Sequence, residues 1–277
     1  MYCGNCFRDN ALVTEFRRMG HDALMVPLYL PLTLDEEDQS KGTPIFFGGL
    51  NVYLSQKFKL FRKAPNWLRN IFNAKIIIRS IGKIAGKTRG KDVGALTLSM
   101  IRGEEGNQLK ELEELVSWIK EGDKPDIICL SNALLIGMSR RLREELSIPI
   151  ICLLEGEDTF LDSLPSPERE KSWEEIQRRV SDVSLFISPS HYYSNVMADR
   201  AAIPRERLVQ IYNGINLEGS CDGRNFDLYC ALSKCRSMWK GAIDFTSAIQ
   251  ARRGANQIDA NLKSRCQYII DGYIDGV

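Results

Sequence analysis

The stretch PDIICLSNALLIGMSRRLREELSIPIICLLEGED, residues 125–158, decides the fold. It contains two short apolar runs, 125–130 and 148–154, that are typical of buried strands, with an amphipathic run at 133–146 between them. A strand, a helix and a strand in this order form a βαβ unit with parallel strands. Polar residues follow both apolar runs, so we expect ligand contacts at the carboxyl edge of a parallel sheet.

The same alternation continues on both sides of this unit. A helix is expected at 9–19 with a strand at 23–27, and later helices at 167–180 and 190–202 alternate with strands at 185–187 and 208–211. This order predicts an α/β protein with a doubly wound, Rossmann-like parallel sheet covered on both faces. The sequence starts at the turn that normally follows the first strand, so we expect a missing central strand and poor folding.

Three other regions frame this alternation. Residues 27–50 predict an ordered surface excursion held by Tyr29, Phe46 and Phe47. Helical patterns at 66–72, 76–84, 92–98 and 108–120 predict a helical insertion on one face. After Gly219 the alternation stops and four of the eight cysteines gather. We therefore expect a Rossmann-like domain over 1–218 and an irregular, divergent tail over 219–277, with a frameshift, fusion or disorder as the hypothesis for the tail.

Charge and hydropathy limit the partners. With 37 Lys and Arg against 36 Asp and Glu, the net charge of +1 gives no field that would attract nucleic acid. No run approaches the roughly 20 apolar residues of a membrane span, and the first residues do not resemble a signal peptide. We expect a cytoplasmic protein without a transmembrane segment, which leaves room for peripheral membrane contact. Cys129 and Cys152 lie in apolar runs and are expected to be buried, reduced thiols.

The first turn, YCGNC at residues 2–6, has three interpretations. Cys3 and Cys6 form a Cys-x-x-Cys pair at a helix start, as in a thioredoxin-like disulfide oxidoreductase. A zinc site would need two more ligands, and no second pair is found, so no metal is expected. The favoured interpretation is a turn whose free amides bind an anion or polyol, with a plain helix cap as the alternative. Its candidate substrate-binding residues are Gly4, Asn5, Arg8 and Asn10.

A second polar cluster, EGED at residues 155–158, follows an apolar strand. Its carboxylates could accept hydrogen bonds from sugar hydroxyls or act as a general base, so Glu157 and Asp158 are catalytic candidates and Gly156 a binding candidate. The alternative is that Asp158 caps the next turn. Asn132, at the end of the preceding strand, is equally explained as a ligand contact or a helix N-cap.

The last polar positions follow the final two predicted strands. Ser190 is a natural N-cap as well as a binding candidate, and His191 could be a proton shuttle. No Gly-x-Ser-x-Gly motif is present, so a serine hydrolase is not supported. Asn213 and Gly214 form a turn signal after the strand at 208–211, and both are candidates for substrate binding.

Six segments resemble, in their order and separation, a bacterial branch of glycosyltransferase family 4. They are RDNAL (8–12), RMGHD (18–22), VPLY (26–29), GEDTFL (156–161), SPS (188–190) and YNGIN (212–216), so the resemblance covers residues 1–218. It implies the N-terminal, acceptor-side half of a GT-B fold. It also implies retaining, metal-independent hexosyl transfer, with a nucleotide-sugar as co-substrate, an acceptor as second substrate and no other cofactor.

Two departures from the family bear on activity. The family's donor-site pair of glutamates, separated by seven residues, has no counterpart after Asn216, and many relatives carry a histidine near the position of residues 155–157. The resemblance thus implies an acceptor-side part that is inactive by itself. A non-catalytic ligand-binding α/β domain and the oxidoreductase using Cys3 and Cys6 remain the alternatives.

Overall fold

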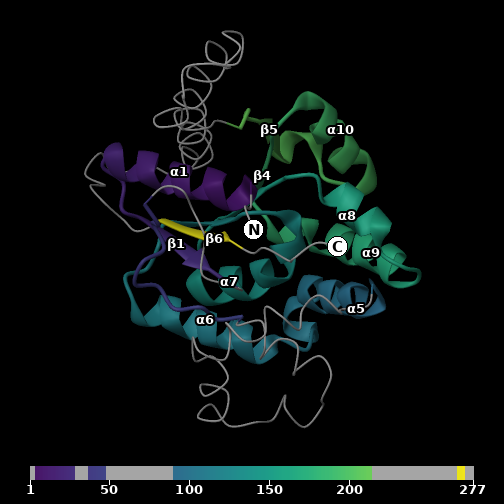
Figure 1. The fold of residues 1–277 in the computed structure, drawn as a ribbon, viewed down its shortest axis with the longest axis horizontal. Helices are drawn as coiled ribbons and strands as arrows, with labels where there is room; N and C mark the ends of the chain where they lie inside the picture. Colours follow the sequence, from purple (N-terminus) through teal and green to yellow (C-terminus); the bar gives the residue numbers. More distant parts are fainter. Residues whose placement is uncertain (1–3, 29–36, 48–89, 214–266, 272–277) are drawn as a thin grey trace, which may run out of the picture.

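The computed structural model describes residues 4–28, 37–47, 90–213 and 267–271. Their strands form one six-stranded sheet in the order β1-β6-β2-β3-β4-β5, and every pair is parallel (Figure 1). The predicted Rossmann-like parallel sheet is therefore confirmed. The strands are β1 (Ala23–Pro27), β2 (Ile127–Leu130), β3 (Ile150–Leu153), β4 (Leu185–Ser188), β5 (Leu208–Gln210) and β6 (Gln267–Asp271).

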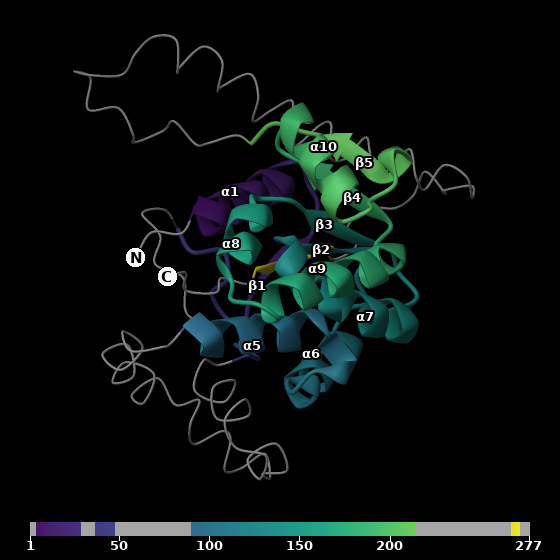
Figure 2. The ribbon, with the colours of Figure 1, turned by 90° about the vertical axis from the view of Figure 1, so that its right-hand side faces the viewer.

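Helices cover the sheet unequally on its two faces. The first helix, α1 (Gly4–Arg18), lies on one side, and α5, α6 and α7 lie on the other (Figure 2). The helical segments after α1 lie between successive strands, in the alternating order that the sequence predicts. Their bounds are α5 (Gly90–Ile101), η3 (Gly103–Glu105), α6 (Leu109–Glu121), η4 (Ala133–Met138), α7 (Ser139–Leu146), α8 (Glu157–Ser163), α9 (Glu168–Arg179), η5 (Val180–Asp182), α10 (His191–Arg200) and η6 (Arg205–Arg207).

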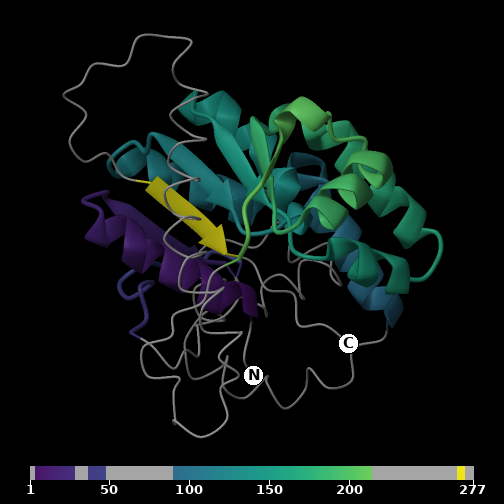
Figure 3. The ribbon, with the colours of Figure 1, turned by 90° about the horizontal axis from the view of Figure 1, so that it is seen from above.

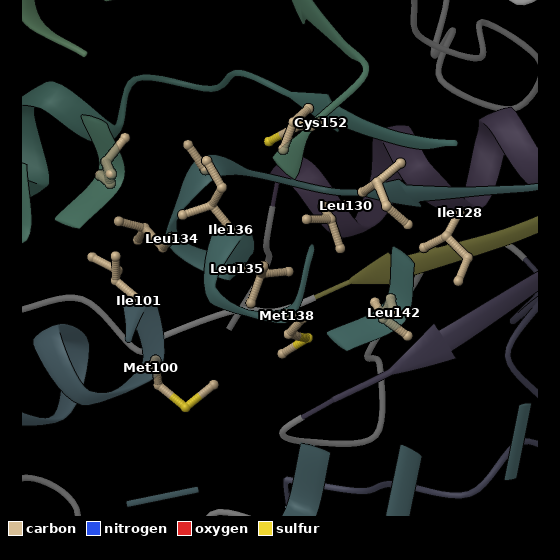
Figure 4. Close-up of a cluster of buried hydrophobic side chains, with 14 of the residues drawn as sticks. Met100, Ile101, Ile128, Leu130, Leu134, Leu135, Ile136, Met138, Leu142 and Cys152 are labelled. Atoms are coloured by element: carbon tan, nitrogen blue, oxygen red, sulfur yellow. The ribbon is translucent and has the colours of Figure 1, made fainter. Parts of the chain in front are cut away.

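Two hydrophobic clusters hold these layers together, because successive strand residues face opposite sides of a sheet. Ile128 and Leu130 belong to the larger cluster, which includes Leu135 and Leu142 from η4 and α7 (Figure 4). Their neighbours Ile127 and Cys129 belong to the smaller cluster with Val13 and Phe16 of α1. The expectation that Cys129 and Cys152 are buried free thiols is confirmed, and burial raises the pKa of both.

The central strand position is filled from the far end of the sequence. β6 pairs with all of β1 on one side and with β2 on the other, and it lies alongside the teal strands in Figure 3. The prediction that a central strand is missing from the sheet is therefore wrong. A segment at 267–271, inside the predicted tail, meets backbone groups of β1 and β2 that would otherwise be left open.

Several local expectations change in detail. α1 begins at Gly4 and not at residue 9, the helix expected at 133–146 is divided into η4 and α7, and α8 was not expected. The excursion is held as predicted: Phe47 is buried and its N donates to Leu28 O at 2.8 Å. The Phe46 ring lies 5.3 Å from the Trp118 ring. Tyr29 and the helical patterns at 66–72 and 76–84 lie outside the described residues.

Candidate functional site

The carboxyl ends of the strands form one polar edge, because the sheet is entirely parallel. α1 runs back along the sheet before β1, so its first turns lie at this same edge. We call the residues there the carboxyl rim, and define it by the first turns of α1, residues 131–133 after β2, residues 155–158 after β3, and the start of α10. In doubly wound sheets this edge is where ligands bind.

Arg8 joins three parts of the carboxyl rim. Its Nη2 donates to the Ser131 carbonyl at 3.0 Å, its Nε donates to Asp9 Oδ1 at 2.7 Å, and its Nη1 pairs with the Glu155 carboxylate. The side chains of Arg8 and Glu155 are 9% and 13% exposed, so the pair is largely shielded yet still reaches solvent. One guanidinium thus ties α1 to the ends of β2 and β3 and orients a carboxylate at the rim.

Glu157, two residues after Glu155, is buried. Its Oε1 accepts from Ala133 N at 2.7 Å. Its Oε2 accepts from Tyr193 Oη at 2.7 Å, from Glu155 N at 2.9 Å and from Gly156 N at 3.1 Å. Burial raises the pKa of Glu157, and the donated hydrogen bonds act in the opposite direction. The carboxylate links the ends of β2 and β3 to α10, so its geometry favours a positioning role over that of an exposed general base.

Tyr193 is the member of this group that the sequence did not single out. It lies in α10, is 6% exposed, and receives a long hydrogen bond from Asp158 N at 3.4 Å. Burial, followed by the negative charge of Glu157, raises the pKa of Tyr193. Its position three residues after the Ser190 N-cap predicts only an inward-facing helical residue. No sequence signal pairs it with a carboxylate 36 positions away.

Two candidate residues act as helix caps. Asn132 Oδ1 accepts from Leu134 N at 3.0 Å at the start of η4, and Ser190 Oγ accepts from Tyr193 N at 3.1 Å at the start of α10. Both residues lie on the carboxyl rim, so a role as helix cap does not rule out a contact with a ligand. Gly156 precedes α8 with a φ of +100°, a conformation that residues with a Cβ rarely adopt.

The other candidates are spread more widely. Asn10 is buried, where its Nδ2 donates to Glu37 O at 3.1 Å and its Oδ1 accepts from Gln39 N at 2.9 Å, so its amide holds the excursion. Asp158 is half-buried and Asn213 is exposed. The remaining positions are Gly4 and Asn5 in the first turn of α1, exposed His191, buried Cys6, and Gly214 and Cys3 outside the described residues.

Two features are absent from the described ranges. No helix there is both long and apolar enough to cross a bilayer. Over the same ranges, no group of three or more His, Cys, Asp or Glu side chains is placed to hold a metal ion.

The parallel sheet and its polar carboxyl rim define a Rossmann-like α/β domain. Residues 87–218 match the sequence model of Glycosyltransferase Family 4, so this part of the chain belongs to that family. A search of curated proteins finds no match to the chain. The family match covers β2 to β5 and supports a transferase of the glycosyltransferase kind.

Proposed function

We propose that this protein forms the acceptor side of a glycosyltransferase that uses a nucleotide-sugar, with retaining transfer of a hexosyl group. The family match supports the class, and the resemblance of the first turn and strand ends supports the finer assignment. The observation that carries the proposal is the Arg8–Glu155 pair, because it brings the first helix and the family region together at the carboxyl rim. The cytoplasmic location, the lack of a metal or other cofactor, and the domain boundary at 218 stay predictions.

The chemistry of the rim suits a polyol. Glu155 and Asp158 are partly accessible carboxylates that can accept hydrogen bonds from sugar hydroxyls. Arg8 orients the first of these carboxylates. Glu157 fixes the backbone of residues 155 and 156 by accepting from both of their N–H groups. In this proposal Glu157 positions the acceptor-binding turn, and Glu155 and Asp158 contact the acceptor.

Saccharide binding tests the proposal most directly. We expect the purified full chain to bind members of an immobilised saccharide panel, and Glu155→Gln to weaken that binding at least about tenfold, which corresponds to about 1.4 kcal/mol. Glu170→Gln is the matched control, because Glu170 forms an exposed ion pair with Arg169 in the first turn of α9 and is not one of the carboxyl-rim residues. Failure of the unsubstituted chain to bind any saccharide, or equal binding by Glu155→Gln, would contradict the proposal.

A second assay separates transfer from binding alone. Nucleotide-sugars are incubated with the chain and the bound saccharides, and nucleoside diphosphate release is followed. We expect binding without release, as proposed for an acceptor-side part that is inactive by itself. Release that requires the saccharide would show that the chain is an active transferase. Rapid alkylation of Cys6 at neutral pH would instead favour the oxidoreductase, because a redox cysteine is an accessible thiolate.

A further inference from the structure

β6 enters the sheet differently from the strands of the family region. Residues 131–149 connect β2 to β3, and residues 189–207 connect β4 to β5, so each crossover places neighbouring strands side by side. Residues 211–266 separate β5 from β6, yet three strands lie between them in the sheet, because β6 sits between β1 and β2. It is therefore inserted into the sheet by a long-range return of the chain.

The space that β6 occupies is bounded by the edges of β1 and β2, and α1 packs over it. β1 pairs with it from Ala23↔Gln267 to Pro27↔Asp271, and β2 pairs with it from Ile127↔Gln267 to Leu130↔Ile270. α1 contacts both β1 and β6. Residues of β1 and β2 beside this space are buried, among them Met25 and Cys129. Without β6, both edges would present unpaired N–H and C=O groups.

We propose that the space between β1 and β2 is a strand-acceptor groove, and that it binds residues 267–271 of its own chain as an added, separable parallel strand. Main-chain hydrogen bonds to two edges supply the affinity in such β-augmentation. The sequence of the segment, QYIID, fits a central strand because its middle is aromatic and β-branched. The maximal span of residues 211–266 far exceeds the width of the sheet.

The groove opens toward the carboxyl rim. Asp271 pairs in register with Pro27, and Ile270 pairs with Leu130, the residue just before Ser131. Since Arg8 donates to the Ser131 carbonyl, the carboxyl end of β6 reaches the rim beside this contact. Docking of the strand therefore completes both the sheet and one side of the rim. Pairing of the strand with both edges does not require transferase activity.

A labelled peptide tests whether the strand is separable. The peptide spans residues 262–274, and it is titrated into the full chain and into full-length Ile269→Pro. Proline removes a ladder hydrogen bond from a central strand, so the variant's own segment should leave the groove. We expect the peptide to bind Ile269→Pro at least about tenfold more tightly than the unsubstituted chain. A peptide that itself carries Ile269→Pro should bind neither protein.

Equal binding of the peptide to both proteins, or no binding to a folded Ile269→Pro chain, would overturn the proposal. A cross-link covers the case in which that variant does not fold. Ile269 is in register with Cys129, and strands about 4.8 Å apart lie within the Cα separation of a disulfide. Ile269→Cys is therefore refolded in an oxidising glutathione buffer, since Cys129 is buried, and its disulfides are mapped by mass spectrometry.

We expect an intramolecular Cys129 disulfide in Ile269→Cys and none in Tyr268→Cys. Tyr268 is one residue out of register with Cys129, and such a shift reverses the side of the sheet on a β-strand. A disulfide-linked dimer would overturn the assignment of the chain's own segment and indicate strand exchange with a second copy. Cross-linking in neither variant, or equally in both, would overturn the groove itself.

Discussion

Two buried charged residues, Glu157 and Arg179, organise their surroundings in different ways. Glu157 lies at the carboxyl rim and accepts hydrogen bonds from four donors. Arg179, whose side chain is fully buried, lies in the helical layer at the end of α9. A buried charge costs free energy unless it is paired and hydrogen-bonded, so the neighbours of each group decide what it contributes.

The partners of Arg179, which together we call the Arg179 centre, lie at or near the ends of helical segments and not at the ends of strands. Nη1 donates to Glu104 Oε2 at 3.0 Å and to Gly137 O at 3.3 Å, and Nη2 donates to the Arg102 carbonyl. Glu104 also accepts from Arg140 at 3.1 Å. Backbones meet closely here: a Cβ on Gly137 would lie 2.2 Å from Met100 O. Arg179 thus joins the end of α9 to η4 and to residues 102–104, which directly follow α5.

The two residues have different roles: Arg179 stabilises helix packing, and Glu157 fixes the geometry of the candidate site. The partners of Arg179 are Arg102, Glu104 and Gly137, none of which belongs to the carboxyl rim, so its loss should affect stability more than the geometry of the rim. Glu157 fixes the rim itself, since two of its donors are the backbone N–H groups of residues 155 and 156. Changes at Glu157 should therefore alter both stability and ligand binding.

The largest effect is expected for Arg179→Met. Removing one partner of a buried ion pair typically costs about 3–5 kcal/mol. We expect the lower end, about 3 kcal/mol, because Glu104 keeps Arg140 and is 20% exposed. Urea unfolding measures the change. Arg178→Met is the matched control: Arg178 is the preceding residue, is 42% exposed, and should change stability by less than about 1 kcal/mol. Equal losses in the two variants would show that the buried centre has no special role.

Glu157→Gln should cost about 2 kcal/mol, because a glutamine places an NH₂ group where the carboxylate accepts hydrogen bonds, leaving buried donors unsatisfied. It should also weaken saccharide binding, whereas Arg179→Met should not. Urea unfolding and the saccharide panel measure the two effects, with Glu170→Gln as the control for both. Saccharide binding that is lost in Arg179→Met but kept in Glu157→Gln would reverse the comparison.

Tyr193→Phe should have the smallest effect of the three, about 1 kcal/mol, because it removes the hydrogen bond to Glu157 and the long one from Asp158 N but keeps the ring. The neighbouring Tyr192 is 75% exposed, so Tyr192→Phe should leave the unfolding midpoint unchanged. A loss of the same size in Tyr192→Phe would show that the hydrogen bond to Glu157 is not the cause.

The same variant gives a pH signature at Glu157. Burial holds the pKa of this carboxyl above its ordinary value of 4.5, and the Tyr193 hydrogen bond lowers it. A carbon-detected NMR titration should show the pKa moving further upward in Tyr193→Phe. Because the folded-state pKa lies above the unfolded one, the Glu157 contribution to the free energy of unfolding falls as pH rises from 4.5 to the folded pKa. A downward movement in the variant would contradict this account.

The sequence by itself determined the alternation of strands and helices, because short apolar runs such as 127–130 can be satisfied only inside a layered sheet. It also placed the polar positions 131–132 and 155–158 at one edge, since parallel strands share their carboxyl ends. The caps at Asn132 and Ser190 were readable for the same local reason, a side-chain oxygen next to free helix amides.

Only the tertiary structure decided which of these polar groups meet. The pairing of Tyr193 with Glu157, and of Arg8 with Glu155, joins residues distant in sequence, and such contacts leave no periodic signal. The structure also placed residues 267–271 in the central strand position, because backbone hydrogen bonds of two open edges accept any segment of suitable pattern that can reach them. Local sequence specifies strands, whereas their neighbours are chosen by the assembled sheet.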